Sequence, residues 1–171
     1  MAPFGSGRRV RLALDARQAP QGAVVDVGTY DAVAFSIALI YAKTTQPVFA
    51  YDYFDAPPAE STKKNHGPSL CGTVKERLRP WQAAVVAGDV REQLHTLPER
   101  IGCCQIDLND AEAESAVLAA VYPRLVPGGV LLLDDYGFSR YSASAEAHRA
   151  YLADKEQVLE MMTGQGLLIK K

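Results

Sequence analysis

Residues 125–137 read LVPGGVLLLDDYG, and this stretch decides the fold. Its run of apolar residues at 130–133 predicts a strand buried on both faces, as the central strands of parallel sheets are. The strand ends on two adjacent carboxylates, Asp134 and Asp135. The Pro-Gly-Gly segment at 127–129 is expected to end a preceding helix, because proline and glycine interrupt helices.

A second strand with a similar ending lies upstream, in the sequence IGCCQIDLND at 101–110. The strand is expected over 103–106, and Asp107, Asn109 and Asp110 follow it. A helix between the two strands makes them parallel neighbours joined by a right-handed crossover. Because ligands collect at the carboxyl ends of such strands, carboxylates from both can share one site. Their oxygens suit a hard cation such as Mg²⁺; the alternative is that these acids cap helices and face solvent.

The helix expected between these strands has one apolar face. Glu112 and Glu114 lie in its first turn, where negative charge favours the helix dipole. Asp110 or Asn109 can cap its start. Its apolar residues recur at the spacing of one helix face, and they are Val117, Leu118, Val121, Tyr122 and Leu125.

A strand, a glycine turn and a helix open the regular part of the chain. The strand is expected over 23–27, with Asp26 near its end. Gly28 lets the backbone approach a ligand at the helix N-terminus, as in nucleotide-binding α/β folds. Asp52 follows the next strand, at 47–51, and stands where such folds bind ribose hydroxyls. A GxGxxG motif is absent, which argues against NAD.

The rest of the chain continues the alternation of strands and helices. Residues 1–20 are expected to form a tail with a short helix at 8–17, and residues 60–69 a mobile polar segment. The other expected elements are helices at 31–43, 71–79, 91–97 and 142–155, and strands at 82–87, 158–161 and 166–170. A turn at 163–164 joins the last two strands.

The composition is that of an ordinary globular protein. The 171 residues fit one domain, with 48% apolar and 22% charged residues. A net charge of −2 without a basic stripe predicts no nucleic-acid partner, and the apolar runs are too short to span a membrane. Three cysteines, an odd number, argue against a disulfide framework. Since no secretion signal is present either, we expect a cytoplasmic location.

The order of these elements resembles that of class I S-adenosylmethionine-dependent methyltransferases. Within that superfamily, the sequence resembles the macrocin-type (mycinamicin/tylosin) O-methyltransferases over residues 23–171. The most specific part is LVPGGVLLLDDYG with IDLN upstream. The other similar segments are VVDVGTYDAVAFS at 24–36, FAYDYFDAPP at 49–58, GDVREQLHTLP at 88–98 and GQGLLIKK at 164–171.

The resemblance implies a fold and an activity. The fold is α/β, a Rossmann-like seven-stranded, mostly parallel sheet with helices on both faces and an antiparallel last strand. A single methyltransferase domain is implied over residues 21–171. The implied cofactors are S-adenosyl-L-methionine and Mg²⁺, and the implied reaction is O-methylation of a hydroxyl on a small, sugar-like natural product.

The resemblance also assigns residues to three parts of a site. Asp26 and Gly28 are assigned to the methionine part of the cofactor, Asp52 to its ribose, and Gly88 and Asp89 to the adenine side. Apart from the resemblance, Tyr53 is expected to form part of the core and of the wall on the adenine side. Asp107, Asp134 and Asp135 are the implied metal ligands, with Asp107 also beside the cofactor and a candidate catalytic residue. His148, on the helix after the acid pair, is a candidate base, with a surface position as the alternative.

Three positions depart from the family pattern, because Ala32 replaces a glycine, Asn109 replaces an acid and Ala111 replaces a tyrosine. Two alternatives therefore stay open. One is a non-catalytic S-adenosylmethionine-binding or scaffold domain, and the other is a metal-independent N- or O-methyltransferase. The expected partner is a small hydroxylated substrate. A homo-oligomer is also left open, because a chain this short can complete its site by pairing.

Overall fold

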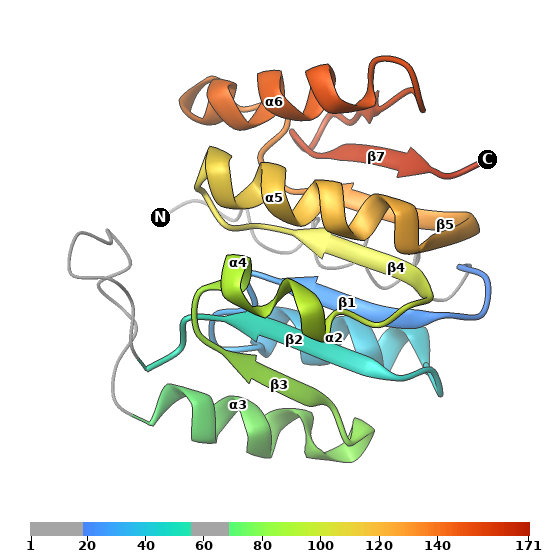
Figure 1. Cartoon of the computed structure of the whole chain (residues 1–171). Coiled ribbons are helices and arrows are strands. Elements are labelled where there is room, and N and C mark those ends of the chain that lie inside the picture. Colours follow the sequence, from blue (N-terminus) through green and yellow to red (C-terminus); the bar gives the residue numbers. More distant parts are fainter. Residues whose placement is uncertain (1–18, 56–68) are drawn as a thin grey trace.

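The computed structural model describes residues 19–55 and 69–171, and these form a seven-stranded sheet (Figure 1). The strands are β1 (Ala23–Val27), β2 (Val48–Asp52), β3 (Ala84–Ala87), β4 (Ile101–Ile106), β5 (Leu125–Leu133), β6 (Leu159–Glu160) and β7 (Gly166–Ile169). Their order across the sheet is β3-β2-β1-β4-β5-β7-β6. The first five strands are parallel, and β7 is antiparallel to both β5 and β6. The predicted α/β sheet with an antiparallel last strand is confirmed.

Helices cover both faces of the sheet, as predicted. The helices are α2 (Val33–Ala42), α3 (Leu70–Leu78), α4 (Val90–Gln93), α5 (Ala111–Val121) and α6 (Ser142–Leu152). Apolar residues of α2 and α3 pack on one face, and those of α4, α5 and α6 pack on the other. Short 3₁₀ segments join some of these elements: η1 (Arg79–Trp81), η2 (Leu94–Thr96), η3 (Tyr122–Arg124) and η4 (Ser139–Tyr141).

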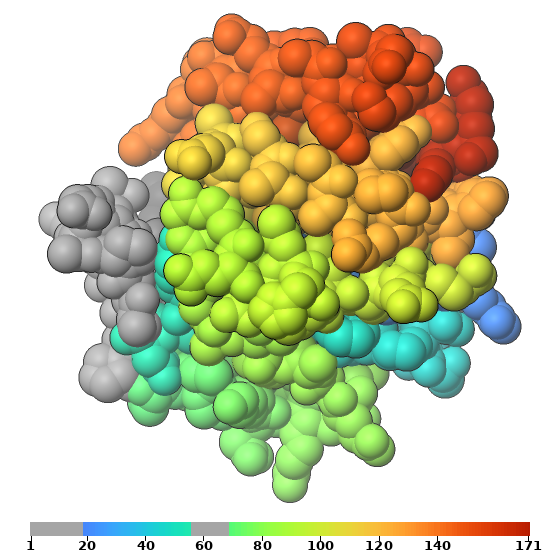
Figure 2. Space-filling view, viewed as in Figure 1, coloured from blue at the N-terminus to red at the C-terminus, as the bar shows by residue number. Residues whose placement is uncertain are grey.

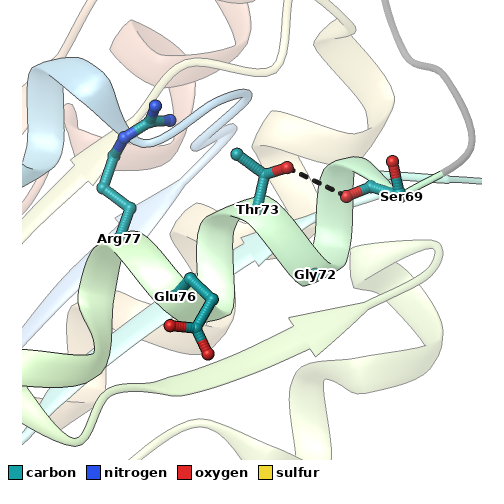
Figure 3. Close-up of a pocket in the computed structure, with 5 residues that line it drawn as sticks. All are labelled: Ser69, Gly72, Thr73, Glu76 and Arg77. Carbon is teal, nitrogen blue, oxygen red and sulfur yellow. Dashed lines mark hydrogen bonds between the residues drawn. The ribbon is translucent and has the colours of Figure 1, made fainter.

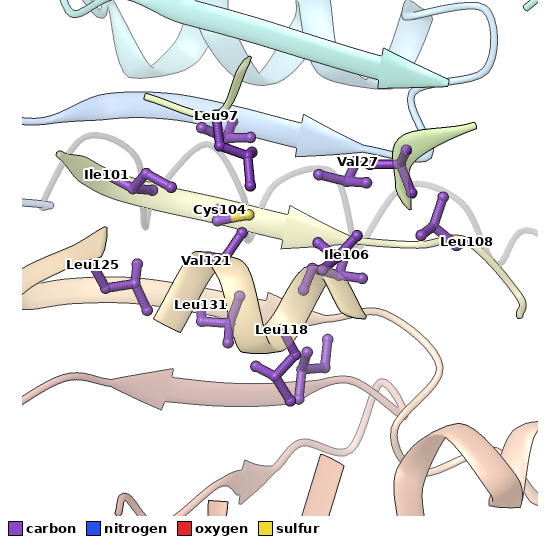
Figure 4. Packing of buried hydrophobic residues seen from close by; sticks show 14 of the residues in the cluster. Val27, Leu97, Ile101, Cys104, Ile106, Leu108, Leu118, Val121, Leu125 and Leu131 are labelled. Atoms are coloured by element: carbon purple, nitrogen blue, oxygen red, sulfur yellow. The ribbon is translucent and has the colours of Figure 1, made fainter. Parts of the chain in front are cut away.

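The two faces carry separate apolar clusters, because neighbouring residues of a strand point to opposite sides of a sheet. Cys104 and Ile106 of β4 belong to the cluster beneath α5, together with Leu118 (Figure 4). Cys103, one residue earlier, belongs to the cluster beneath α2 and α3. Both cysteines are buried, which agrees with their expected role as small apolar core residues.

Helices α5 and α6 pack against each other, and their atoms form adjoining gold and orange bands in the upper part of the surface (Figure 2). Their contact buries polar side chains as well as apolar ones. Glu114 of α5 is 4% exposed, and His148 of α6 is 2% exposed. Ser144, one turn before His148, is also buried. The surface position considered for His148 is therefore wrong, because the ring lies in the contact between the two helices.

The Pro-Gly-Gly segment has a different role from the one expected. Helix α5 ends at Val121, since the 3₁₀ segment η3 with Pro123 follows it directly. Strand β5 already begins at Leu125, which pairs with Ile101. Residues 127–129 therefore form an irregular part of β5 rather than a helix stop.

The first helix also starts later than expected, at Val33. Tyr30 and Ala32 have φ angles of 53° and 58°, in the left-handed region, so the chain cannot enter the helix before Ala32. The short helix expected at 8–17 lies outside the described residues, as does nearly all of the expected mobile segment at 60–69. Within the described ranges, no helix has the length and apolar character needed to cross a membrane.

Candidate cofactor and metal site

The acids predicted to form a site lie along one edge of the sheet, at the carboxyl ends of the parallel strands. Backbone hydrogen bonds fix their level there. The Asp107 N–H donates to the Val27 carbonyl at 2.8 Å, and the Asp134 N–H donates to the Ile106 carbonyl at 3.0 Å. Asp107 is therefore level with the end of β1, and Asp134 is level with the end of β4. This arrangement brings the ends of β1, β4 and β5 together, as expected for a ligand site in an open α/β sheet.

Three carboxylates at this edge form a group that could hold a metal ion. One oxygen from each of Asp107, Asp134 and Asp135 lies within 4.8 Å of the other two. Burial, and then the charges of Asp134 and Asp135, raise the pKa of Asp107 well above its usual range. Like charges at this separation repel, and a divalent cation would remove the repulsion. The donor set therefore fits Mg²⁺, which prefers carboxylate oxygens.

The turn that carries Asp107 has a strained backbone. Asn109 has a φ of 59°, a left-handed conformation that asparagine tolerates better than most residues. Its side-chain amide donates to Asp107 Oδ1 at 3.0 Å. Asn109, where the family pattern has an acid, therefore orients Asp107 in this structure. Asp110 caps α5, accepting hydrogen bonds from the Glu112 and Ala113 amides, as predicted.

Two buried residues that support this group were not predicted as site residues. Gln165, which is fully buried between β6 and β7, donates from Nε2 to Asp134 Oδ1 at 2.6 Å. Glu114 accepts hydrogen bonds from the amides of Leu108 and Asn109. Glu114 lies three residues before Val117 on the apolar face of α5, so helical spacing could have indicated its burial. No sequence pattern indicated Gln165.

Asp26, at the end of β1, provides the second part of the site. Its side chain is 5% exposed, and Oδ1 has no hydrogen-bond partner in the described part of the chain. Burial is the main reason that its pKa rises from 3.8 to about 7. A buried carboxylate oxygen without a partner is costly unless a ligand supplies one. The ammonium group of S-adenosylmethionine is such a partner, so the residue fits the role predicted for it.

The turn after Asp26 approaches the end of β4 closely. Gly28 has a φ of 93°, and a Cβ atom there would overlap the Asp107 carbonyl oxygen. Only glycine allows this approach without displacing the backbone. The left-handed φ of Ala32 gives a physical reason for the glycine in the family pattern, because glycine adopts that conformation without strain.

A small cavity lies between the ends of β2 and β3 and the start of α5. Asp52 accepts hydrogen bonds from the amides of Tyr30 and Tyr53, each at 2.7 Å. The Tyr53 hydroxyl donates to Asp89 at 3.0 Å. Asp89 also accepts from Arg91, and this bond lowers the pKa of Asp89 to about 2. The cavity is lined by Asp52, Tyr53, Gly88, Val90, Leu108, Asp110 and Ala113, so three residues predicted for the ribose and adenine lie together.

His148 has a different setting from that of the acid group. Its Nε2 lies 3.4 Å from Glu114 Oε2, and neither ring nitrogen makes a hydrogen bond among the described residues. Burial, followed by the charge of Arg149, lowers the pKa of His148 to about 4, so the ring is neutral at pH 7. The described contact of His148 is with Glu114, and its role as a base stays a prediction.

A second hollow, of about 620 Å³, lies along α3 (Figure 3). It is lined by Ser69, Gly72, Thr73, Glu76 and Arg77. The Thr73 hydroxyl is bonded to the Ser69 carbonyl, and the Arg77 guanidinium donates to the Asp31 carbonyl. These side chains therefore bond to the first turn of α3 and to the segment before α2. The acid group at the strand ends therefore remains the better candidate for chemistry.

Comparison with known families identifies the class of protein. A family model described as "Methyltransferase domain" matches residues 25–136 of the 171. The chain belongs to this family, and it is an S-adenosylmethionine-dependent methyltransferase, as predicted. The matched residues run from β1 to Tyr136 and include the acid group. A search of curated proteins finds no match to the sequence.

Solved structures share the fold at low sequence identity. The O-methyltransferase NovP has a TM-score of 0.74 and 15% identity, over 96% of this chain and 79% of NovP. The calicheamicin methyltransferase CalS11 has a TM-score of 0.71 and 18% identity, over 95% of this chain and 77% of CalS11. TomG from Streptomyces achromogenes, solved in complex with SAM, has a TM-score of 0.70 and 11% identity, over 97% and 81% of the chains. These similarities confirm the fold.

Proposed function

We propose that this methyltransferase transfers a methyl group to a hydroxyl of a small, sugar-like molecule, with Mg²⁺ bound at Asp107, Asp134 and Asp135. One observation carries the proposal. The three carboxylates lie within 4.8 Å of one another at the strand ends, and the unpartnered oxygen of Asp26 lies at the same edge of the sheet. A divalent cation and a methyl donor can therefore bind side by side.

The cofactor would lie along the ends of β1, β2 and β3. Asp26 would bind the ammonium group of the methionine part, beside the Gly28 turn. Asp52 would bind the ribose hydroxyls, because it ends β2 at the carboxyl edge of the sheet and lines the small cavity there. Tyr53, Gly88 and Asp89 would border the adenine, next to the cavity that two of them line.

Methyl transfer from a sulfonium to a hydroxyl needs no covalent intermediate on the protein. The C–O bond forms as the C–S bond breaks, and the hydroxyl loses one proton. A bound Mg²⁺ lowers the pKa of a hydroxyl that coordinates it and fixes its position. The protein has to align donor and acceptor and to accept the proton. We assign the role of proton acceptor to Asp107, because it lies between the turn after Asp26 and the pair Asp134 and Asp135.

The choice of a sugar-like acceptor draws support from the structural neighbours. CalS11 is described as a TDP-rhamnose 3'-O-methyltransferase, and NovP as an O-methyltransferase. The same fold also occurs in an rRNA methylase from Streptococcus thermophilus, so the fold alone does not select the acceptor. The proposed acceptor therefore follows the sugar O-methyltransferases that the sequence resembles over residues 23–171.

Calorimetry with S-adenosylmethionine, with and without Mg²⁺, tests the proposal. The matched variant changes Asp134 and Asp135 to Ala and leaves Asp26 in place. We expect the parent to bind both ligands, and the variant to bind S-adenosylmethionine alone. Transfer of a radiolabelled methyl group to nucleotide sugars and other glycosides should then require Mg²⁺ and be lost on adding EDTA.

Each other outcome points to an alternative. Methyl transfer that persists in EDTA would show a metal-independent N- or O-methyltransferase. Cofactor binding without transfer to any acceptor of this class would favour a non-catalytic binding domain. Failure of the parent to bind S-adenosylmethionine would contradict the assignment of Asp26 and Asp52.

A further inference from the structure

A buried carboxylate of helix α5 holds the turn that carries Asp107. Glu114 Oε1 accepts the Leu108 N–H at 3.1 Å and the Asn109 N–H at 2.9 Å. The Glu114 side chain is 5% exposed, and the Leu108 bond is buried. Two consecutive amides directed at one oxygen fix the orientation of both peptide groups. The turn after β4 is therefore set by a residue of the following helix.

This bond is connected to Asp107 through Asn109. The left-handed φ of Asn109, 59°, reverses the chain so that its side chain points back along the turn. Asn109 Nδ2 then donates to Asp107 Oδ1 at 3.0 Å. A continuous path of hydrogen bonds thus runs from the Glu114 carboxylate, through Asn109, to the carboxylate of the metal group.

Glu114 is also in contact with two residues of α6. His148 Nε2 lies 3.4 Å from Glu114 Oε2, and the Ser144 hydroxyl bonds to the same side chain. Both residues are buried between α5 and α6. The Glu114 carboxylate therefore has little freedom to turn away from the two amides.

We propose that Glu114 is a positioning residue, which holds Asp107 in place for a divalent cation through the amides of Leu108 and Asn109. This inference rests on the proposed function, because it concerns the same metal group. Residues that orient a metal ligand without touching the ion change metal affinity about 10- to 100-fold when they are removed. The simpler alternative is that Glu114 only satisfies two amides of a loop, with no effect on the ion.

Two conservative variants separate hydrogen-bond geometry from charge. Glu114→Gln keeps an acceptor oxygen at the same distance from the helix and removes the charge. Glu114→Asp keeps the charge and withdraws the oxygens by one methylene group, out of reach of the amides. Glu112→Asp is the matched control, since Glu112 is in the same turn and its side chain is 85% exposed.

The measurement is Mn²⁺ binding followed by electron paramagnetic resonance, with Mn²⁺ as a probe for a carboxylate site. We expect Glu114→Asp to weaken Mn²⁺ binding by about tenfold or more, with Glu114→Gln and the Glu112 control within about threefold of the parent. Amide hydrogen exchange at Leu108 and Asn109 should speed up in Glu114→Asp and stay slow in Glu114→Gln. Thermal unfolding shows whether each variant is folded.

The outcomes separate this inference from the proposed function. If the parent binds Mn²⁺ and Glu114→Asp binds it equally well, the positioning role is overturned while the metal site stands. Weak binding by Glu114→Gln with normal binding by Glu114→Asp would also overturn it, because charge alone would then explain the effect. If the parent binds no Mn²⁺, the proposed metal dependence fails, and the positioning role fails with it.

Discussion

Gln165 donates a hydrogen bond from Nε2 to Asp134 Oδ1 at 2.6 Å, across 31 positions in the sequence. Both side chains are buried. The Gln165 backbone carbonyl also accepts the Met161 N–H at 2.8 Å, so the turn between β6 and β7 holds the glutamine in place. One oxygen of Asp134 is thereby occupied by an amide donor. The antiparallel end of the sheet thus orients a carboxylate that belongs to the parallel part.

The first prediction concerns this bond. Gln165→Leu removes the donor while keeping a side chain of similar size, so Asp134 Oδ1 loses this hydrogen bond. We expect Mn²⁺ affinity to fall about tenfold, as for other residues that orient a metal ligand. Gln157→Leu is the control, because Gln157 is exposed. Equal Mn²⁺ affinities in the two variants would show that the bond does not orient Asp134 for the ion.

The second prediction is that S-adenosylmethionine binding depends on the ionisation of Asp26. With a pKa of about 7, Asp26 is mostly protonated at pH 6 and mostly ionised at pH 7.5. The cofactor ammonium binds the ionised form, so affinity should rise nearly tenfold over this interval. Calorimetry at several pH values measures it. Asp26→Asn should bind weakly at every pH, and a pH-independent affinity in the parent would contradict the assignment.

The third prediction concerns stability, with the cofactor and metal absent. Because the folded-state pKa of Asp26 lies above 3.8, the folded protein binds its proton more tightly than the unfolded chain. The contribution of Asp26 to the free energy of unfolding is therefore full below pH 4 and is lost as the pH rises to 7. Relative to the parent, Asp26→Asn should gain about 3 kcal/mol between pH 5 and pH 8. Urea unfolding at the two pH values measures this difference.

The fourth prediction has the opposite sign and concerns His148. Its folded-state pKa of about 4 lies below 6.5, so the unfolded chain takes up the proton first as the pH falls. Its contribution to stability is full above pH 6.5 and is lost as the pH falls to 4. His148→Leu should remove about 3 kcal/mol of the acid sensitivity between pH 7 and pH 4. His95→Leu is the control, because His95 is exposed. If His148→Leu leaves the loss of stability at low pH unchanged, the buried ring is already charged in the folded protein.

The fifth prediction compares two glycines. Gly28→Ala places a Cβ atom against the Asp107 carbonyl at a φ of 93°, so we expect a loss of more than about 2 kcal/mol in the free energy of unfolding. Gly72→Ala, in helix α3, places its Cβ in open space. It should stabilise the protein by about 0.5–1 kcal/mol through helix propensity. Similar effects of both changes would show that the turn after β1 can relax.

The sequence predicted the parallel sheet and the grouping of Asp107, Asp134 and Asp135 because both depend on local patterns. Apolar runs such as 130–133 mark buried strands, and parallel strands bring their carboxyl ends to one edge. The prediction of element boundaries failed where the same residues are compatible with two different structures. The Pro-Gly-Gly segment is as suited to an irregular strand as to a helix stop, and pairing with β4 and β7 decides between them.

The supporting residues were harder to predict, for a different reason. Glu114 and His148 each lie on the apolar face of their own helix, but polar residues are expected to be exposed. Their burial depends on α5 and α6 packing together, which neither helix reveals by itself. Gln165 depends on the position of β7 beside β5, a contact between distant parts of the chain.

The position of Gln165 also bears on the order in which the site can form during synthesis. A ribosome makes β1, β4 and β5, together with Asp107, Asp134 and Asp135, before it reaches residue 165. Domains generally fold as units, and the N-terminal part of a chain leaves the ribosome first. A nascent chain that ends before the β6–β7 hairpin carries every proposed ligand, but Asp134 lacks the amide that orients it. The proposed metal site would therefore reach its full affinity only when the last strands of the sheet have been made.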